Sequence, residues 1–219
     1  MDSRHKGFTL IEILVVIVIF SIIVAATYQA LFTGNSLWFQ TETKIKLREN
    51  LRLSIDRLIR EVQQSGIDKK GISQIFILNG EGFNSSDVLR FSIPIVCEVN
   101  GNVMGNDGYV AHWGAPLTWG CHAPTCMDAD NNCNTIDYKY LEYRLSKDSK
   151  LLRRVLDYNW QVIREDVIAQ HIMDFQVEQS FDQRIVSIHV TAEEVSNSKA
   201  PFSVEADFDV YLRNIEGRK

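Results

Sequence analysis

The sequence predicts an α+β fold in which a long N-terminal helix packs on an antiparallel β-sheet domain. Two observations lead to this prediction. An apolar run near the N-terminus continues into a segment with helical periodicity that lasts until Gly66. Beyond Gly66, apolar residues recur at every second position in short runs separated by turn residues. The 219 residues suit one medium domain with an appendage, or two very small domains.

The composition bounds the function before any motif is considered. Apolar residues make up 45% and charged residues 23% of the chain, as in an ordinary globular protein. The formal net charge is -5, and the sequence has no cluster of Lys and Arg with interleaved aromatic residues. Nucleic acid is therefore not expected as a direct partner.

Residues 8–32 form the first predicted element, a membrane-spanning helix. Nearly every residue there is apolar or small, and Glu12 is the only charge. About 20 apolar residues suffice to span a bilayer, and the cost of one acidic residue, roughly 2.5–3.5 kcal/mol even at the helix centre, is less than their summed contribution. Arg4, His5 and Lys6 precede the helix and predict a cytoplasmic N-terminus, so the rest of the chain lies across the membrane.

Three kinds of N-terminal segment fit this pattern. A secretory signal peptide would use the stretch VAA at residues 24–26 as its cleavage site, and a plain single-pass anchor would need no cleavage. The third follows from the stretch GFTLIE at residues 7–12 after a short basic leader, which resembles the processing site of type IV prepilins and pseudopilins. The resemblance implies that residues 1–7 are a leader peptide, that prepilin peptidase cuts between Gly7 and Phe8, and that Phe8 is then N-methylated.

Glu12 is explained by the same resemblance. An ionisable group in a membrane segment is costly and is retained where a partner or a function offsets the cost. In the pilin family the corresponding glutamate pairs with the first-residue amine of a neighbouring subunit and sets the register of assembly. In this chain the amine would belong to Phe8. Two alternatives stay open, in which Glu12 bonds the first-residue amine of its own chain one turn back or lies at the level of the lipid headgroups.

The helix is predicted to continue as an amphipathic half over residues 33–66, with Gly34 and Asn35 as a weak point between the halves. Apolar residues at helical spacing define the side expected to pack on the following domain, namely Leu47, Leu51, Ile55, Leu58, Ile59 and Val62. Charged residues occupy most of the remaining surface, namely Lys46, Arg48, Glu49, Arg52, Asp56, Arg57, Arg60 and Glu61.

Residues 67–219 are predicted to form a β-rich domain. Strands are expected at residues 75–78, 87–97, 138–145, 151–158, 172–179, 185–191 and 202–212. The last strand alternates, with Val204, Ala206, Phe208, Val210 and Leu212 inward and Glu205, Asp207, Asp209 and Tyr211 outward. Turns are expected at residues 79–82 and 181–183. Residues from about 100 to 135 lack periodicity and are expected to form a long loop.

Two further stretches resemble the same family. Residues 48–66 and 210–214 are similar to minor pilins of the PilW type and to J-type minor pseudopilins of type II secretion. The resemblance implies a type IV pilin-like fold and a non-enzymatic minor pilin of a type IV pilus, with a minor pseudopilin as the alternative. An exported binding protein or enzyme behind a removable signal is the competing class.

The resemblance also implies partners and a location. The partners are prepilin peptidase, other major and minor pilins or pseudopilins, and the inner-membrane assembly platform. The chain is expected in the inner membrane as a single-pass protein with a cytoplasmic N-terminus before assembly, and afterwards in the pulled-out fibre, in the periplasm or at the cell surface.

The four cysteines suggest either disulfide bonds or a metal site. Cys97 ends a predicted strand, whereas Cys121, Cys126 and Cys133 lie in the long loop. An exported domain meets an oxidising compartment, where an even number of cysteines favours disulfides, and the spacing leaves all three pairings open. The alternative is a metal site, in which Cys121, His122 and Cys126 would be completed by Cys133 or His112.

The same loop contains a partial calcium pattern. Asp128, Asp130, Asn132 and Asn134 offer oxygen ligands at alternate positions. Cys133 stands where the tight turn needs glycine, and Lys139 stands where the bidentate glutamate belongs, so a solvated polar turn is the alternative. No other cofactor is expected. The scattered histidines and the lack of a nucleophile, zinc-protease or phosphate-binding motif predict no enzymatic activity.

Overall fold

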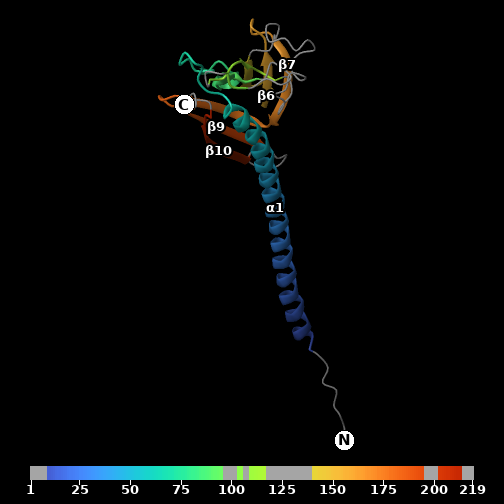
Figure 1. The fold of residues 1–219 in the computed structure, drawn as a ribbon. Coiled ribbons are helices and arrows are strands. Elements are labelled where there is room, and N and C mark those ends of the chain that lie inside the picture. The colour runs from blue at the N-terminus through green and yellow to red at the C-terminus, as the bar shows by residue number, and fades with distance from the viewer. Residues whose placement is uncertain (1–8, 96–102, 106–108, 117–139, 195–201, 214–219) are drawn as a thin grey trace. The chain divides into compact units, whose positions relative to one another are not determined.

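The computed structural model describes residues 9–95, 103–105, 109–116, 140–194 and 202–213. Helix α1 (Leu10–Val62) comes first, and a β-rich region follows it (Figure 1). The chain divides into two compact units, Met1–Lys46 and Leu47–Lys219. The division falls inside α1, so the apolar part of the helix and the end of its amphipathic part belong to different units.

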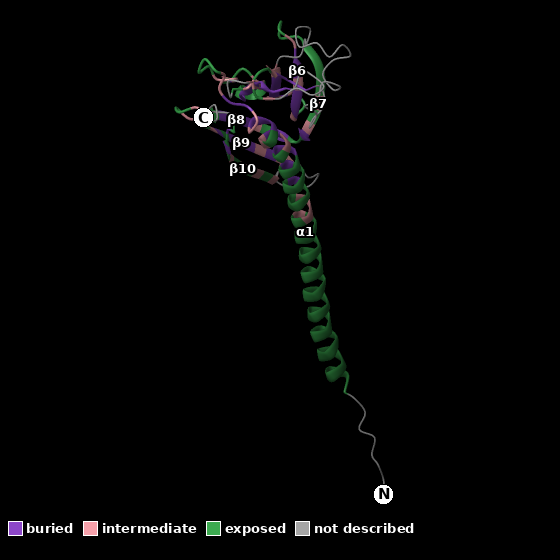
Figure 2. Cartoon of the chain, in the orientation of Figure 1, coloured by how far each residue is buried: buried purple, intermediate pink, exposed green. Residues whose placement is uncertain are grey.

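The first part of α1 exposes its side chains without interruption. Every residue from Thr9 to Asn35 is exposed (Figure 2). The hydroxyls of Ser21 and Thr27 donate to the carbonyls of Ile17 and Ile23 at 2.7 and 2.8 Å, so these polar groups are satisfied within the helix. By length and composition this part of α1 is able to cross a membrane. The predicted weak point is not a break, because α1 continues through Gly34 and Asn35.

The strands form two larger antiparallel sheets and one small ladder. A five-stranded sheet has the order β1-β2-β5-β6-β7, made of β1 (Ile75–Leu78), β2 (Val88–Phe91), β5 (Tyr140–Leu145), β6 (Lys150–Leu156) and β7 (Val162–Gln170). A three-stranded sheet has the order β10-β9-β8, made of β8 (Ile172–Gln179), β9 (Ile185–Glu194) and β10 (Phe202–Tyr211). Strands β3 (Ile93–Pro94) and β4 (Trp113–Gly114) pair with each other, and a short 3₁₀ turn, η1 (Phe83–Ser85), precedes β2.

The predicted α+β, type IV pilin-like arrangement of a long apolar N-terminal helix and antiparallel sheets is confirmed, with three errors in the strands. The single strand predicted at residues 87–97 is divided into β2 and β3, which belong to different sheets. Strand β7 was not predicted, because Arg164, Glu165 and Asp166 interrupt the alternation of its apolar residues. It lies at the edge of its sheet, where side chains on both faces stay exposed. Strand β4 lies within residues 100–135, so the prediction of a long loop is wrong at that point.

The core joins the end of α1 to both larger sheets. Leu47, Leu51, Ile55, Leu58 and Val62 are buried, and Ile59 is partly buried against them, as the helical spacing predicts. They share one apolar cluster with inward residues of β2, β5, β6, β8 and β9. The predicted alternation of β10 is also confirmed, since its outward residues are exposed and its inward residues are buried or half-buried.

The two larger sheets are joined by a buried carboxylate. Asp87 precedes β2 and is 5% exposed. Its Oδ2 accepts a hydrogen bond from the Val177 amide of β8 at 2.8 Å, and its Oδ1 accepts one from the Gly80 amide at 2.9 Å. The Asp87 amide in turn donates to the Phe175 carbonyl at 2.8 Å. Gly80 lies in the predicted turn with a φ of +66°, a conformation that glycine adopts without strain.

Candidate functional site

The carboxylate of Glu12 closes a capping box at the start of α1. The helix begins at Leu10, so Thr9 is its N-cap and Glu12 is its third residue. The Thr9 amide donates to Glu12 Oε2 at 2.9 Å, and the Glu12 amide donates to Thr9 Oγ1 at 3.3 Å. The Thr9 hydroxyl also donates to Glu12 Oε2 at 2.9 Å. These reciprocal bonds satisfy amide groups that a helix N-terminus otherwise leaves open.

In the uncleaved chain the carboxylate of Glu12 is hydrogen-bonded within its own chain. Glu12 accepts its hydrogen bonds from Thr9 of the same chain, three residues back. Both hydrogen bonds go to Oε2 of the carboxylate. After cleavage, a positive amine would stand on Phe8, the residue that directly precedes the capping residue Thr9. The site is therefore a carboxylate held at a helix N-terminus, and its capping residue Thr9 lies one residue after the predicted cleavage point.

Comparison with protein families finds a match, and it covers the residues of the capping box. Residues 2–28 match the family model described as the prokaryotic N-terminal methylation motif. The chain carries the type IV pilin signal. The matched residues include the predicted cleavage point, the capping box and most of the apolar segment, which supports membership of the type IV pilin and pseudopilin family. A search of curated proteins and a search of solved structures gave no significant match.

Several residues predicted from the sequence lie outside the described residues. They are Gly7 and Phe8 at the cleavage point, the four cysteines Cys97, Cys121, Cys126 and Cys133, and the proposed calcium ligands Asp128, Asp130, Asn132 and Asn134. Within the described residues, no group of three or more His, Cys, Asp and Glu side chains is arranged to hold a metal ion. The disulfide, zinc and calcium hypotheses therefore stay predictions.

A second carboxylate of α1 lies in the protein core. Glu61 is 3% exposed and contacts Arg153 of β6, which is fully buried. Arg153 Nη2 donates to Glu61 Oε1 at 2.9 Å, and Arg153 Nε lies 3.0 Å from both carboxylate oxygens. The Tyr143 hydroxyl of β5 donates to Glu61 Oε2 at 2.6 Å. We call Glu61, Tyr143 and Arg153 the buried triad.

The buried triad ties three parts of the chain together. Tyr143 and Arg153 are cross-strand partners on the inward face of the five-stranded sheet, and Glu61 comes from the last turn of α1. Arg153 Nη2 also donates to the Pro116 carbonyl at 3.1 Å, which fixes the chain just after β4. Arg153 Nη1 lies 3.8 Å from Asp166 of β7. A single guanidinium therefore holds α1, the β4 segment and the sheet edge.

The charges of the buried triad stabilise one another. Burial, followed by the negative charge of Glu61, raises the pKa of the Tyr143 phenol well above its ordinary value. Burial alone would lower the pKa of Arg153, but the hydrogen bonds and the charge of Glu61 outweigh it and raise that pKa. Tyr143 therefore stays a hydrogen-bond donor, and Arg153 stays a cation.

The sequence analysis missed the buried triad and assigned Glu61 to the charged remaining surface of α1, which the structure contradicts. A signal was present. Glu61 follows Leu58 by three residues, so it falls within the buried side of the helix. Arg153 lies between the buried Leu151 and Val155, at an inward position of an alternating strand. A charge at a position that the spacing assigns to the core indicates a buried partner.

Proposed function

We propose that the chain is a minor pilin of a type IV pilus. Prepilin peptidase cuts it after Gly7 and methylates the amine of Phe8, and the mature subunit enters the filament or its priming complex at the tip. It acts as a non-enzymatic building block. The observation that carries the proposal is the N-terminal methylation motif at residues 2–28, placed on a helix whose side chains from Thr9 to Asn35 are all exposed.

The exposed apolar part of α1 supports assembly through the helix. Such a surface needs either lipid or other apolar helices around it, because water disfavours it by about 25 cal/mol for each Å². In the membrane, lipid covers the segment before assembly. In a fibre, the same segments of neighbouring subunits would cover one another. The helix thus has an apolar environment before and after extraction from the membrane.

The capping box suggests how Glu12 changes partner. Before cleavage the carboxylate accepts from Thr9 of its own chain. Cleavage after Gly7 would create an ammonium group at Phe8, and a bond from a charged donor is roughly twice as strong as a neutral one. The proposal is that Glu12 pairs with this group on a neighbouring subunit, while lipid or packed helices keep the local dielectric low.

The mass of the mature N-terminus tests the proposal. Protein purified from the membrane of its own cells should begin at methylated Phe8. A start near Thr27 would support the signal-peptide reading, and an intact Met1 would support a plain anchor. A Gly7→Leu variant is the control, because a bulky residue before the cut should leave the leader of residues 1–7 attached. Either alternative start in the wild-type protein would overturn the pilin proposal.

Two substitutions at Glu12 separate capping from charge pairing. Glu12→Ala should leave precursor levels in the membrane normal and reduce incorporation into filaments at least tenfold. Glu12→Gln keeps the acceptor that the capping box needs but removes the charge. If charge pairing sets the register, Glu12→Gln should incorporate as poorly as Glu12→Ala, measured by immunoblotting sheared filaments against membranes. Normal incorporation of Glu12→Gln would show that only capping matters.

Deletion of the gene distinguishes a pilus from type II secretion. Loss of surface filaments with normal export of secreted proteins is expected for a minor pilin. The reverse result would assign the chain to the pseudopilins.

A further inference from the structure

The five-stranded sheet has an outer face, opposite the face that carries the buried triad. Successive residues of a strand point to opposite faces, so Glu142 of β5 points away from the core that its neighbour Tyr143 enters. The register places Arg90 of β2 and Arg154 of β6 opposite Glu142 on its two sides. Glu165 of β7 lies opposite Arg154. Four charged residues of alternating sign thus form one row across four strands.

Three arginines surround the buried carboxylate of Glu142, which is 2% exposed. Its Oε2 accepts from Arg90 Nε at 2.6 Å, and its Oε1 lies 3.6 Å from Arg154 Nη1 and 3.8 Å from Arg144 Nη1. Arg154 Nε also donates to Glu165 at 2.6 Å. We call these five residues the charged cluster. It carries one surplus positive charge on a chain whose net charge is -5.

The arginines of the charged cluster keep donors available. All three are partly exposed. Among the described residues, neither Arg144 nor the Nη atoms of Arg90 donate a hydrogen bond to a partner. A guanidinium with unused donors and a surplus of positive charge favours an anionic ligand, and its planar fork matches a carboxylate in two parallel hydrogen bonds.

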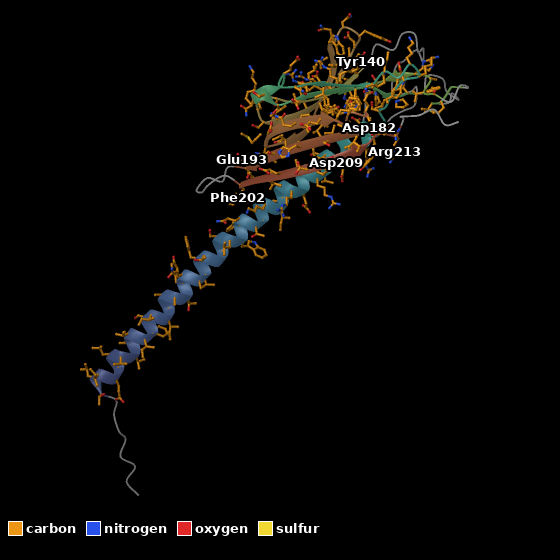
Figure 3. The ribbon with its side chains drawn as sticks, turned by 90° about the vertical axis from the view of Figure 1, so that its left-hand side faces the viewer. Tyr140, Asp182, Glu193, Phe202, Asp209 and Arg213 are labelled. Atoms are coloured by element: carbon orange, nitrogen blue, oxygen red, sulfur yellow. The ribbon has the colours of Figure 1, made fainter. Side chains whose placement is uncertain are left out.

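Aromatic rings lie beside the charged cluster on the same face. Tyr140 precedes Glu142 by two residues and therefore points to the same side of β5. Its ring stacks on Trp160 with centroids 4.5 Å apart and meets Phe76 edge-on at 6.0 Å. The guanidinium carbon of Arg90 lies 4.7 Å from the centre of the Trp160 ring. Figure 3 shows Tyr140 away from the labelled residues of the three-stranded sheet. We call Phe76, Tyr140 and Trp160 the aromatic platform.

The aromatic platform is held in an exposed position. Phe76 is 40% exposed and Trp160 is 45% exposed. Trp160 has a φ of +63°, a left-handed conformation that a bulky residue rarely adopts. The Asp157 carboxylate fixes this turn, because its Oδ1 accepts from the amides of Asn159 and Gln161 at 2.8 and 2.7 Å. Backbone strain of this kind concentrates at ligand-binding sites, which favours a binding role for the exposed ring.

The charged cluster and the aromatic platform together fit a chain of sugars. An exposed aromatic ring covers the apolar C–H side of a sugar ring, and Glu165 is exposed and able to accept from hydroxyl groups. Neighbouring strands lie about 4.8 Å apart, so the backbones of Arg90 and Arg154 are separated by roughly twice that distance. Carboxylates on alternate sugars would meet the arginines, and neutral rings would lie opposite the carboxylates of the cluster.

We propose that the outer face of the five-stranded sheet binds an acidic polysaccharide in which uronic acids alternate with neutral sugars. The uronate carboxylates pair with Arg90 and Arg144, and a neighbouring sugar ring stacks on Trp160. A nucleic acid fits less well, since each strand of a duplex carries one phosphate for about every 3.4 Å and phosphates would also face Glu142 and Glu165. The inference goes beyond the proposed function, because it concerns the β-rich unit alone.

Isothermal titration calorimetry of the full chain in detergent tests the proposal. The probe is a short oligosaccharide of hyaluronan, in which glucuronic acid alternates with a neutral amino sugar, and an oligosaccharide of dextran is the neutral counterpart. Hyaluronan should bind, and raising NaCl from about 50 to 500 mM should weaken its binding. Dextran should bind about tenfold more weakly, because it offers nothing to the arginines.

Two variants test the two parts of the site. Trp160→Gly removes the ring, and glycine adopts a φ of +63° without strain, so the turn should keep its fold. Arg144→Met removes a guanidinium that makes no hydrogen bond within the described residues. Each variant should weaken hyaluronan binding about tenfold. The controls Trp38→Ala and Arg52→Met remove an exposed ring and an exposed guanidinium from α1, and both should bind as the wild type does.

Four results would overturn the proposal. One is a wild-type protein that does not bind hyaluronan, and another is dextran that binds equally well. The third is unchanged affinity in both variants, which would place the bound sugar elsewhere on the chain. The fourth is tighter binding of polyglutamate or of poly(dT) that the same variants abolish, which would assign the face to an acidic peptide or to nucleic acid. None of these results alters the mass of the mature N-terminus, so the pilin proposal is tested separately.

Discussion

Each end of helix α1 contains a glutamate in apolar surroundings, and the two glutamates find their hydrogen-bond partners at different distances along the chain. Each end has a glutamate on an apolar part of the helix, Glu12 in the exposed segment and Glu61 in the domain core. Glu12 takes its hydrogen bonds from Thr9, three residues away. Glu61 takes its bonds from Tyr143 and Arg153, which are 82 and 92 residues away in the chain.

The difference shows that a carboxylate with a local, neutral partner is free to exchange that partner, whereas one with distant, buried partners is not. A local hydrogen bond from a neutral group leaves Glu12 available for a stronger, charged partner. Glu61 already has a cation and a phenol in a buried site, so its exchange for another partner would expose three polar groups to an apolar core. Glu12 therefore suits assembly, and Glu61 suits permanent attachment of the helix to the sheets.

The strongest test of this comparison removes the cation of the buried triad. Arg153→Met should lower the free energy of unfolding of the β-rich unit by about 3–5 kcal/mol, because Glu61 is left as an unpaired buried charge. Denaturant unfolding of the full chain in detergent, followed by tryptophan fluorescence, measures this loss. Arg164→Met is the control, since Arg164 pairs with Asp166 near the surface and should cost at most about 1 kcal/mol. Similar losses in both variants would show that burial of the triad contributes nothing.

The second test compares the two halves of α1 directly. Leu51 is 3% exposed and Leu14 is 52% exposed. Leu51→Ala should destabilise the β-rich unit by about 2–5 kcal/mol through the lost apolar contact and the cavity left behind. Leu14→Ala should leave the unfolding transition unchanged. Equal effects of the two substitutions would mean that the first half of the helix also packs against the domain.

The third and smallest test uses pH. Tyr143→Phe removes a hydrogen bond to a charged group, and we expect a loss of about 1.5–3 kcal/mol at neutral pH. The pKa of Tyr143 is raised above its ordinary 10.0, so above that pH the unfolded chain releases the proton while the folded chain keeps it. The contribution of Tyr143 is thus complete below pH 10 and falls as the pH rises toward its folded pKa. The wild-type stability should therefore approach that of the variant on the alkaline side, and parallel curves would contradict the raised pKa.

The fold was predictable where apolar residues recur at a regular spacing and all of them face the core. Strands β1 and β8 begin and end at the predicted residues, because their apolar alternation is bounded by clear turn residues. The buried side of α1 from Leu47 to Val62 was also predicted from spacing alone. Strand β7 was missed since an edge strand is half in solvent and needs no alternation. The hydrogen bond from Val177 of β8 to Asp87 joins residues 90 positions apart, so no local pattern predicts how the two larger sheets connect.

The candidate site divides in the same way. The stretch GFTLIE, its basic leader and the apolar run are contiguous, so the sequence by itself determined the type IV pilin signal and the membrane-length helix. Only the tertiary structure decided that Glu61 is buried with Arg153 of β6. The physical reason is the separation along the chain between the residues that interact. Helix capping and membrane insertion act between neighbours in the chain, whereas the partner of a buried charge is chosen by how distant strands pack.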